Sequence, residues 1–174
     1  MTMRWRPIAE WAGFQLVWLT CALGAAQGWN APGVIAAGLF IGAALAMKRS
    51  PSSECIAILA SGAVGLIAES VLVSTELVRF AAPWPSSQLA PAWIVALWLA
   101  FGVTLPTMAS LLGHSLVIKA GIVGFVAGPL AYWAGARLGA LEMTGSAPLT
   151  YLASALIWAV ALPSLLIFRQ RMRP

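Results

Sequence analysis

Apolar and polar positions follow one another along this chain in long blocks, without the short periods of a soluble domain. Six apolar blocks are each close to the roughly 20 residues that span the hydrocarbon of a bilayer. The pattern predicts six membrane helices, with approximate limits 9–28, 31–47, 55–79, 91–112, 117–140 and 148–168. We therefore expect an all-α bundle of six transmembrane helices that forms one integral membrane domain over residues 1–174.

Basic residues lie at the ends of these blocks and predict the orientation of the chain. If the N-terminus is cytoplasmic, the Lys and Arg residues lie on the cytoplasmic side, with the exception of Arg79 and Arg137. Because Lys and Arg are retained in cytoplasmic loops, the distribution predicts that both ends of the chain are inside. The composition agrees with surroundings of membrane lipid, since only 9% of the residues are charged, against about 25% in a typical soluble domain.

The third predicted helix carries a carboxylate, Glu69, in the outer half of the bilayer. A charge near the bilayer centre costs about 2.5–3.5 kcal/mol on insertion scales, so we expect this side chain to have a partner or a function. Proton relay, ligand anchoring and plain interhelical hydrogen bonding all stay open at this point. The polar residues that could partner it from other helices or the next turn are Gln15, Ser70, Thr104 and Tyr132.

Further charges are predicted at the outer ends of the third and fifth helices. Glu76 lies two helical turns beyond Glu69 on the same face, and Arg79 follows three residues later, at ion-pair spacing. Arg137 and Glu142 reach the same boundary from the fifth helix. One interpretation is an ion-pair network that tethers helix ends. The other is an outward-facing cavity whose arginines bind an anionic group.

The fifth predicted helix is rich in glycine. Gly124-x-x-x-Gly128 lets another backbone approach closely, and Gly128-Pro129 should kink or break the helix near its middle. We expect the third helix to be its neighbour, because Gly62, Glu69 and Glu76 follow one another every seven residues on one of its faces.

A short pattern recurs between these two helices. Gly-x-Val-Gly-x-x-Ala begins at Gly62 and again at Gly121. This indicates a parallel repeat in which helices 2 and 3 correspond to helices 4 and 5, although independent use of small residues explains it as well. A parallel repeat would place a functional site between its halves.

Three tryptophans, Trp18, Trp98 and Trp158, are predicted to lie deep in the bundle rather than at an interface. Helix packing is the favoured interpretation for them, over a cage around a ligand.

Motifs for several kinds of chemistry are absent from the sequence. The single histidine, His114, falls in a short inner loop, and Cys21 and Cys55 are predicted near opposite faces of the bilayer. No spacing of these residues matches a metal site, and no basic patch is interleaved with aromatics. We therefore predict no catalytic residues, no metal, no cofactor and no nucleic-acid partner, and we favour a non-enzymatic function without excluding catalysis.

Several short signatures together resemble one known family, the uncharacterised bacterial inner-membrane family called domain of unknown function 2878. They are Phe14-Gln15-x-x-Trp18, Glu69-Ser70, Trp93-x-x-x-x-Trp98, Gly128-Pro-Leu-Ala-Tyr-x-Ala-Gly-Ala-Arg-Leu-Gly139 and Trp158-Ala-x-x-x-Pro163. The resemblance covers nearly the whole chain and implies a multi-pass protein of the bacterial inner, cytoplasmic membrane. It implies no activity.

The chain departs from the family pattern in two places. Members usually carry Asp where this chain has Glu69, and Thr-Leu-Asn-His-Ser-Leu where this chain reads Thr104-Leu-Pro-Thr-Met-Ala109. A family function that needs that histidine is therefore not implied for this chain, because His114 does not occupy its position.

Three hypotheses follow for the function. The leading one is binding or transport of a small-molecule or lipid-like ligand in an outward-facing cavity between helices 3 and 5. Its expected ligand-binding residues are Glu69, Glu76, Arg79, Arg137, Glu142, Gln15 and Tyr132. The alternatives are a non-catalytic scaffold or subunit that binds a membrane-protein partner, and an intramembrane lipid-modifying enzyme with Glu69 as acid or base.

Overall fold

The computed structural model describes residues 5–47, 51–113 and 116–172, which form six helices and one two-stranded sheet. The helices are α1 (Trp5–Ala26), α2 (Ala31–Ala46), α3 (Pro51–Ser74), α4 (Ala92–Leu112), α5 (Leu116–Arg137) and α6 (Ala147–Arg171). The strands are β1 (Val78–Phe80) and β2 (Leu141–Met143). Of the residues interpreted above, Arg4, Lys48, Arg49, His114 and Arg173 lie outside the described part of the chain.

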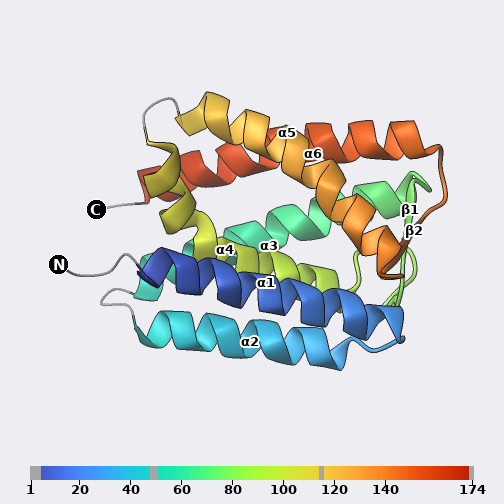
Figure 1. The fold of residues 1–174 in the computed structure, drawn as a ribbon, viewed down its shortest axis with the longest axis horizontal. Coiled ribbons are helices and arrows are strands. Elements are labelled where there is room, and N and C mark those ends of the chain that lie inside the picture. The colour runs from blue at the N-terminus through green and yellow to red at the C-terminus, as the bar shows by residue number, and fades with distance from the viewer. Residues whose placement is uncertain (1–4, 48–50, 114–115, 173–174) are drawn as a thin grey trace.

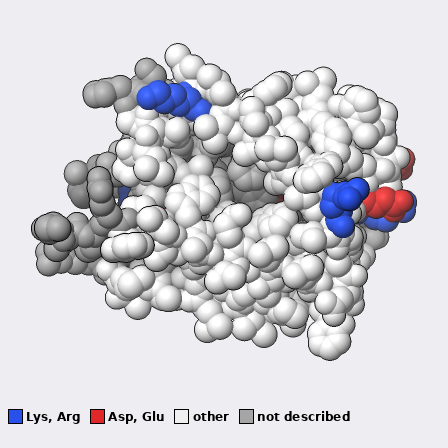
Figure 2. All heavy atoms as spheres, in the orientation of Figure 1, with Lys and Arg blue, Asp and Glu red and all other residues white. Residues whose placement is uncertain are grey.

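Successive helices run back and forth across the molecule, so that α1 begins and α6 ends at the same end of the bundle (Figure 1). Five of the helices are long and apolar enough to cross a membrane. The shorter α2 has 16 residues, about 24 Å at 1.5 Å per residue, so the prediction of six full spans is confirmed for five. On the face in Figure 2, charged atoms lie towards the two ends and leave an uncharged band between them. The chain is a multi-pass membrane protein.

Helix α3 ends at Ser74, so the prediction that it continues to residue 79 is wrong. Glu76 has a left-handed backbone with φ of 55°. The amide of Leu77 then donates to the carbonyl of Leu72 at 3.1 Å. This is the backbone pattern that closes many helices. Glu76 therefore does not continue the helical face that carries Glu69.

Helix α5 ends in the same way. Gly139 has φ of 80°, and the amide of Ala140 donates to the carbonyl of Gly135 at 2.9 Å. Glycine takes this conformation without the steric cost that a Cβ imposes. Each of the two helices is then followed by a short strand, and β1 and β2 pair antiparallel with Arg79 opposite Glu142. This two-stranded sheet was not predicted. Helix α5 is also continuous through Pro129. Of the predicted kink or break, the break does not occur, and the kink stays a prediction.

Helices pack in a different order from the one predicted. Helix α5 lies along α6, α3 lies along α4, and α1 and α2 pack on each other and on α4. The expected α3–α5 pairing is therefore wrong. A Cβ added to Gly128 would meet Trp158 Cδ1 of α6 at 2.7 Å, and one added to Gly65 would overlap Trp98 of α4. These glycines pack against other helices of the same chain. The side chains of Trp98 and Trp158 fill the space that a larger residue at Gly65 or Gly128 would need.

One ion pair is buried at the end of the bundle opposite the two-stranded sheet. Glu54 in the first turn of α3 accepts a hydrogen bond from Arg169 Nη2 in the last turn of α6. The side chains are 9% and 7% exposed. The sequence pattern grouped Arg169 with the other basic residues of the cytoplasmic side, and in the structure its side chain joins two helices that are far apart in the chain.

Removing one partner of this buried pair should destabilise the protein strongly. Glu54→Ala leaves a buried guanidinium without its carboxylate, which costs about 3–5 kcal/mol in comparable cases. The matched control is Glu142→Ala, which removes the acid of the exposed Arg79–Glu142 pair and should cost about 0–1 kcal/mol. Denaturant titration of both variants in a mild detergent, followed by circular dichroism, measures the difference. Equal losses would show that the Glu54–Arg169 pair does not hold α3 to α6.

Candidate functional site

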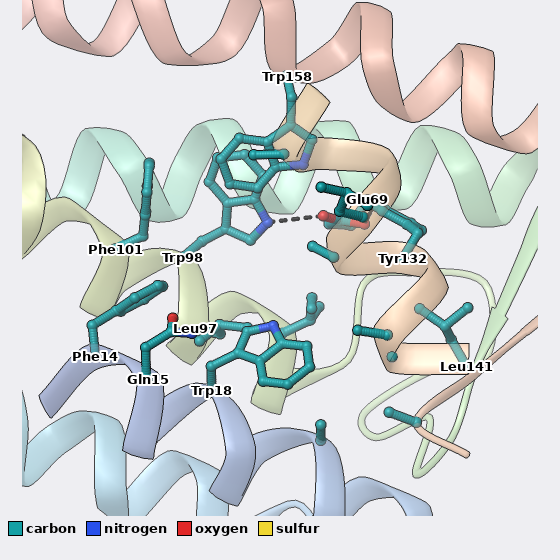
Figure 3. Close-up of a pocket in the computed structure, with 18 of the residues that line it drawn as sticks. Phe14, Gln15, Trp18, Glu69, Leu97, Trp98, Phe101, Tyr132, Leu141 and Trp158 are labelled. Carbon is teal, nitrogen blue, oxygen red and sulfur yellow. Dashed lines mark hydrogen bonds between the residues drawn. The ribbon is translucent and has the colours of Figure 1, made fainter. Parts of the chain in front are cut away.

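Glu69 is held in the centre of the bundle by two aromatic side chains. Its residue surface is only 2% exposed. Trp98 Nε1 of α4 donates a hydrogen bond to Glu69 Oε1 at 2.9 Å, and the Tyr132 hydroxyl of α5 donates to Glu69 Oε2. Figure 3 shows the three side chains converging from their separate helices. One carboxyl group thus joins α3, α4 and α5 through hydrogen bonds to both of its oxygens.

The other expected partners of Glu69 make different contacts. The Thr104 hydroxyl donates to the carbonyl of Phe101 in its own helix at 2.8 Å. The Ser70 hydroxyl accepts a hydrogen bond from the amide of Ala90 at 3.0 Å. Of the four candidates, Tyr132 is bonded to Glu69, and Gln15 lines the same cavity from α1. The partner that sequence reasoning missed is Trp98, because an indole is easily taken for packing alone.

A cavity of about 470 Å³ lies beside this carboxyl group. Helices α1 and α4 form one wall, α5 and α6 form the other, and α3 contributes Glu69. Most of the lining is apolar or aromatic. The aromatic residues that line it are Trp11, Phe14, Trp18, Phe80, Trp93, Trp98, Phe101, Tyr132 and Trp158. A largely apolar cavity with a few convergent polar groups is typical of a small-molecule site.

Several of the aromatic rings that line the cavity are packed against one another. The Trp98 and Trp158 indoles stack with centroids 4.4 Å apart and an interplanar angle of 21°. Phe101 meets Trp158 edge to face at 5.2 Å, and Phe14 of α1 lies 5.7 Å from Phe101. Such ring pairs stabilise beyond the area they bury. The favoured prediction of packing for Trp98 and Trp158 is confirmed, and the same two rings line the cavity.

The cavity opens on the side of the bundle. In Figure 2, drawn in the orientation of Figure 1, the surface is hollowed about midway between the two ends, between α5 and the group of α1 and α4. The predicted outward-facing cavity between helices 3 and 5 is therefore wrong in its walls and its opening. The reason is that α5 packs on α6 rather than on α3, which separates α5 from α1 along this side.

The predicted cluster at the rim forms only in part. Arg79 Nη1 pairs with Glu142 Oε2 at 3.2 Å, across the two strands. Glu76 and Arg79 line a separate polar recess of about 900 Å³ together with Ser86, Gln88 and other loop residues. The helix-surface pair of Arg79 with Glu76 is not formed, because the chain leaves the helix before Glu76. Arg137 is exposed at the end of α5 and lines neither recess.

The sequence model of a family described as a protein of unknown function (DUF2878) matches residues 7–164. The chain belongs to the DUF2878 family. No curated protein and no solved structure matches it.

The signatures by which this DUF2878 protein resembles its family meet at the cavity. They come from α1, α3, α4, α5 and α6, and each contributes at least one residue to the lining. The signature residues in the lining are Phe14, Gln15, Trp18, Glu69, Trp93, Trp98, Leu130, Ala131, Tyr132, Ala134, Gly135 and Trp158. Among the described residues of this DUF2878 protein, no group of three or more His, Cys, Asp or Glu side chains is placed to hold a metal ion.

The wall between α5 and α6 provides a sharp test of this packing. A Cβ on Gly124 would overlap the backbone of Trp158, whereas one on Gly121 would meet the Ala159 carbonyl oxygen at an ordinary 3.6 Å. Gly124→Ala should therefore lower the thermal midpoint by several degrees, because overpacking costs about 1–3 kcal/mol. Gly121→Ala should leave it unchanged or raise it, since Ala is the better helix former by about 1 kcal/mol. Thermal unfolding in detergent checks both, and the reverse order would contradict the α5–α6 contact.

Proposed function

We propose that this DUF2878 protein binds an apolar or amphiphilic small molecule that enters its cavity sideways from the hydrocarbon of the bilayer. The observation that carries the proposal is the opening on the side of the bundle, between α5 and α1, into a cavity walled by apolar and aromatic groups. In a membrane, this side faces lipid. A molecule dissolved in the bilayer therefore reaches the cavity without crossing water.

Glu69 gives this cavity a polar end. Its carboxyl group is one of the few polar groups in the lining, and two aromatic donors fix its position. A small number of placed polar groups in an apolar cavity orients a ligand and confers specificity. The expected ligand-binding residues of this proposal are therefore Glu69, Tyr132 and Gln15, and the rim residues Glu76, Arg79, Arg137 and Glu142 have no part in it.

The alternative of a partner subunit loses its main support. Such a subunit would use its glycine-rich helix faces to pack against another membrane protein. In the structure Gly62 and Gly65 face side chains of α4, and Gly124 and Gly128 face α6. Binding within the chain accounts for these positions.

Sideways entry can be measured with a small lipid-soluble diazirine in phosphatidylcholine vesicles that contain the protein. On illumination we expect adducts on Met108, which lines the cavity and is 8% exposed. Ala131→Phe places a ring in the cavity wall and should reduce this labelling at least tenfold. The control Val126→Phe adds the same ring on α5 outside the cavity lining and should leave it unchanged. Labelling confined to lipid-facing residues such as Val126 in the wild-type protein would overturn the proposal.

We also propose that the protein lies in a bacterial inner membrane with both ends of the chain in the cytoplasm. Lys119, Arg169 and Arg171 lie in the helix turns at one end of the bundle, and Arg79 and Arg137 lie at the other. The bias of basic residues towards one side supports this orientation. Alkaline phosphatase fused after Gly145 should be active in a bacterial host, and the same enzyme fused after Met172 should be inactive. The opposite pattern of activity would show that both ends of the chain lie outside the cytoplasm.

A further inference from the structure

We infer that the ligand of this cavity is a lipophilic organic cation, an apolar body with a protonated amine that lies against Glu69. The inference rests on the proposed function, because it specifies the class of molecule that enters the same cavity. Three features of the lining lead to it: its charge balance, the hydrogen bonding of its carboxyl group, and its aromatic surfaces.

The first feature is the charge balance of the cavity. Among the described residues that line it, Glu69 is the one acidic side chain, and none is Lys, Arg or His. An anionic head group would therefore enter a low-dielectric space that offers a carboxyl group and no counter-charge, which is costly. A cation would instead supply the opposite charge that a buried carboxylate lacks.

The second feature is the hydrogen bonding of the carboxyl group. Trp98 Nε1 and the Tyr132 hydroxyl each donate to one of its oxygens. An ionised carboxylate offers about four lone-pair positions, so each oxygen keeps the capacity to accept a further bond from a ligand. An indole N–H can only donate, so the Trp98 bond favours an electron-rich oxygen at this point. The arrangement is suited to a donor group on the ligand.

The third feature is the aromatic surface next to this carboxyl group. The stacked indoles of Trp98 and Trp158 lie beside Glu69, and Phe14 and Trp18 of α1 line the same cavity (Figure 3). A cation is attracted to the face of an aromatic ring, most strongly to tryptophan, and desolvation strengthens the attraction. Aromatic side chains that line the same cavity as the carboxyl group therefore favour a cationic amphiphile over a neutral one of equal length.

A matched set of single-chain probes tests the inference: decylammonium, decanol and decanoate, which share one chain and differ in the charge of the polar group. Each is added to the wild-type protein in phosphatidylcholine vesicles, and the probe is scored by its ability to prevent diazirine labelling of Met108. We expect decylammonium to compete at a concentration in the bilayer at least tenfold lower than either of the other two.

Two variants assign the effect to Glu69. Glu69→Gln keeps the size of the side chain and removes its charge, and it should weaken decylammonium competition at least tenfold while changing decanol competition less than twofold. Glu76→Gln removes an exposed carboxylate outside the cavity and should change neither. The comparison of the three probes on the wild-type protein requires no variant, so it stands if Glu69→Gln does not fold.

The outcomes separate this inference from the proposed function. If Met108 is labelled but decanol or decanoate competes as well as decylammonium, the ligand is not selected as a cation and the inference is overturned, while sideways entry stands. If decylammonium competes equally against wild-type and Glu69→Gln proteins, the role of Glu69 is overturned. If Met108 is not labelled at all, the proposed function itself fails.

Discussion

The structure depends on how one carboxyl group is accommodated inside an apolar bundle. Glu69 is nearly enclosed, and a buried polar group is costly unless its hydrogen bonds are made. Trp98 and Tyr132 supply them from two further helices. Their positions in turn hold α4 and α5 at the separation that leaves the cavity between them. The hydrogen bonds that Glu69 requires therefore also determine the shape of the candidate site.

Close packing elsewhere explains why the cavity stays open on one side. Helix α6 packs closely against the glycines of α5, and α4 packs closely against the glycines of α3. The result is two tightly packed helix pairs. Interfaces of small residues allow such approach in membranes, where lipid supplies no hydrophobic force between helices. Helix α1 packs on α2 and α4 and has no comparable contact with α5. The side between α1 and α5 is lined by large aromatic groups rather than closed by backbone contact.

The two ends of the molecule are stabilised by different means. At one end the buried Glu54–Arg169 pair joins α3 to α6. At the other, α3 and α5 each end in a left-handed residue and continue into paired strands.

The Glu69–Tyr132 and Arg79–Glu142 pairs are both separated by 63 positions. This spacing differs from that of the glycine pattern at Gly62 and Gly121, and the predicted duplication of helices stays a prediction.

The sequence by itself determined the class of the protein, because the length and hydropathy of each apolar block are local properties that a bilayer selects directly. It also identified the family, and it singled out Glu69, Tyr132 and Gln15, since polar groups at membrane depth are conspicuous. Only the tertiary structure decided which helices pack, that α3 ends before Glu76, and that Trp98 and Arg169 are partners of buried acids. Those features depend on contacts between residues far apart in the chain, where a tryptophan fills the space beside a glycine, and no local pattern encodes which glycine that is.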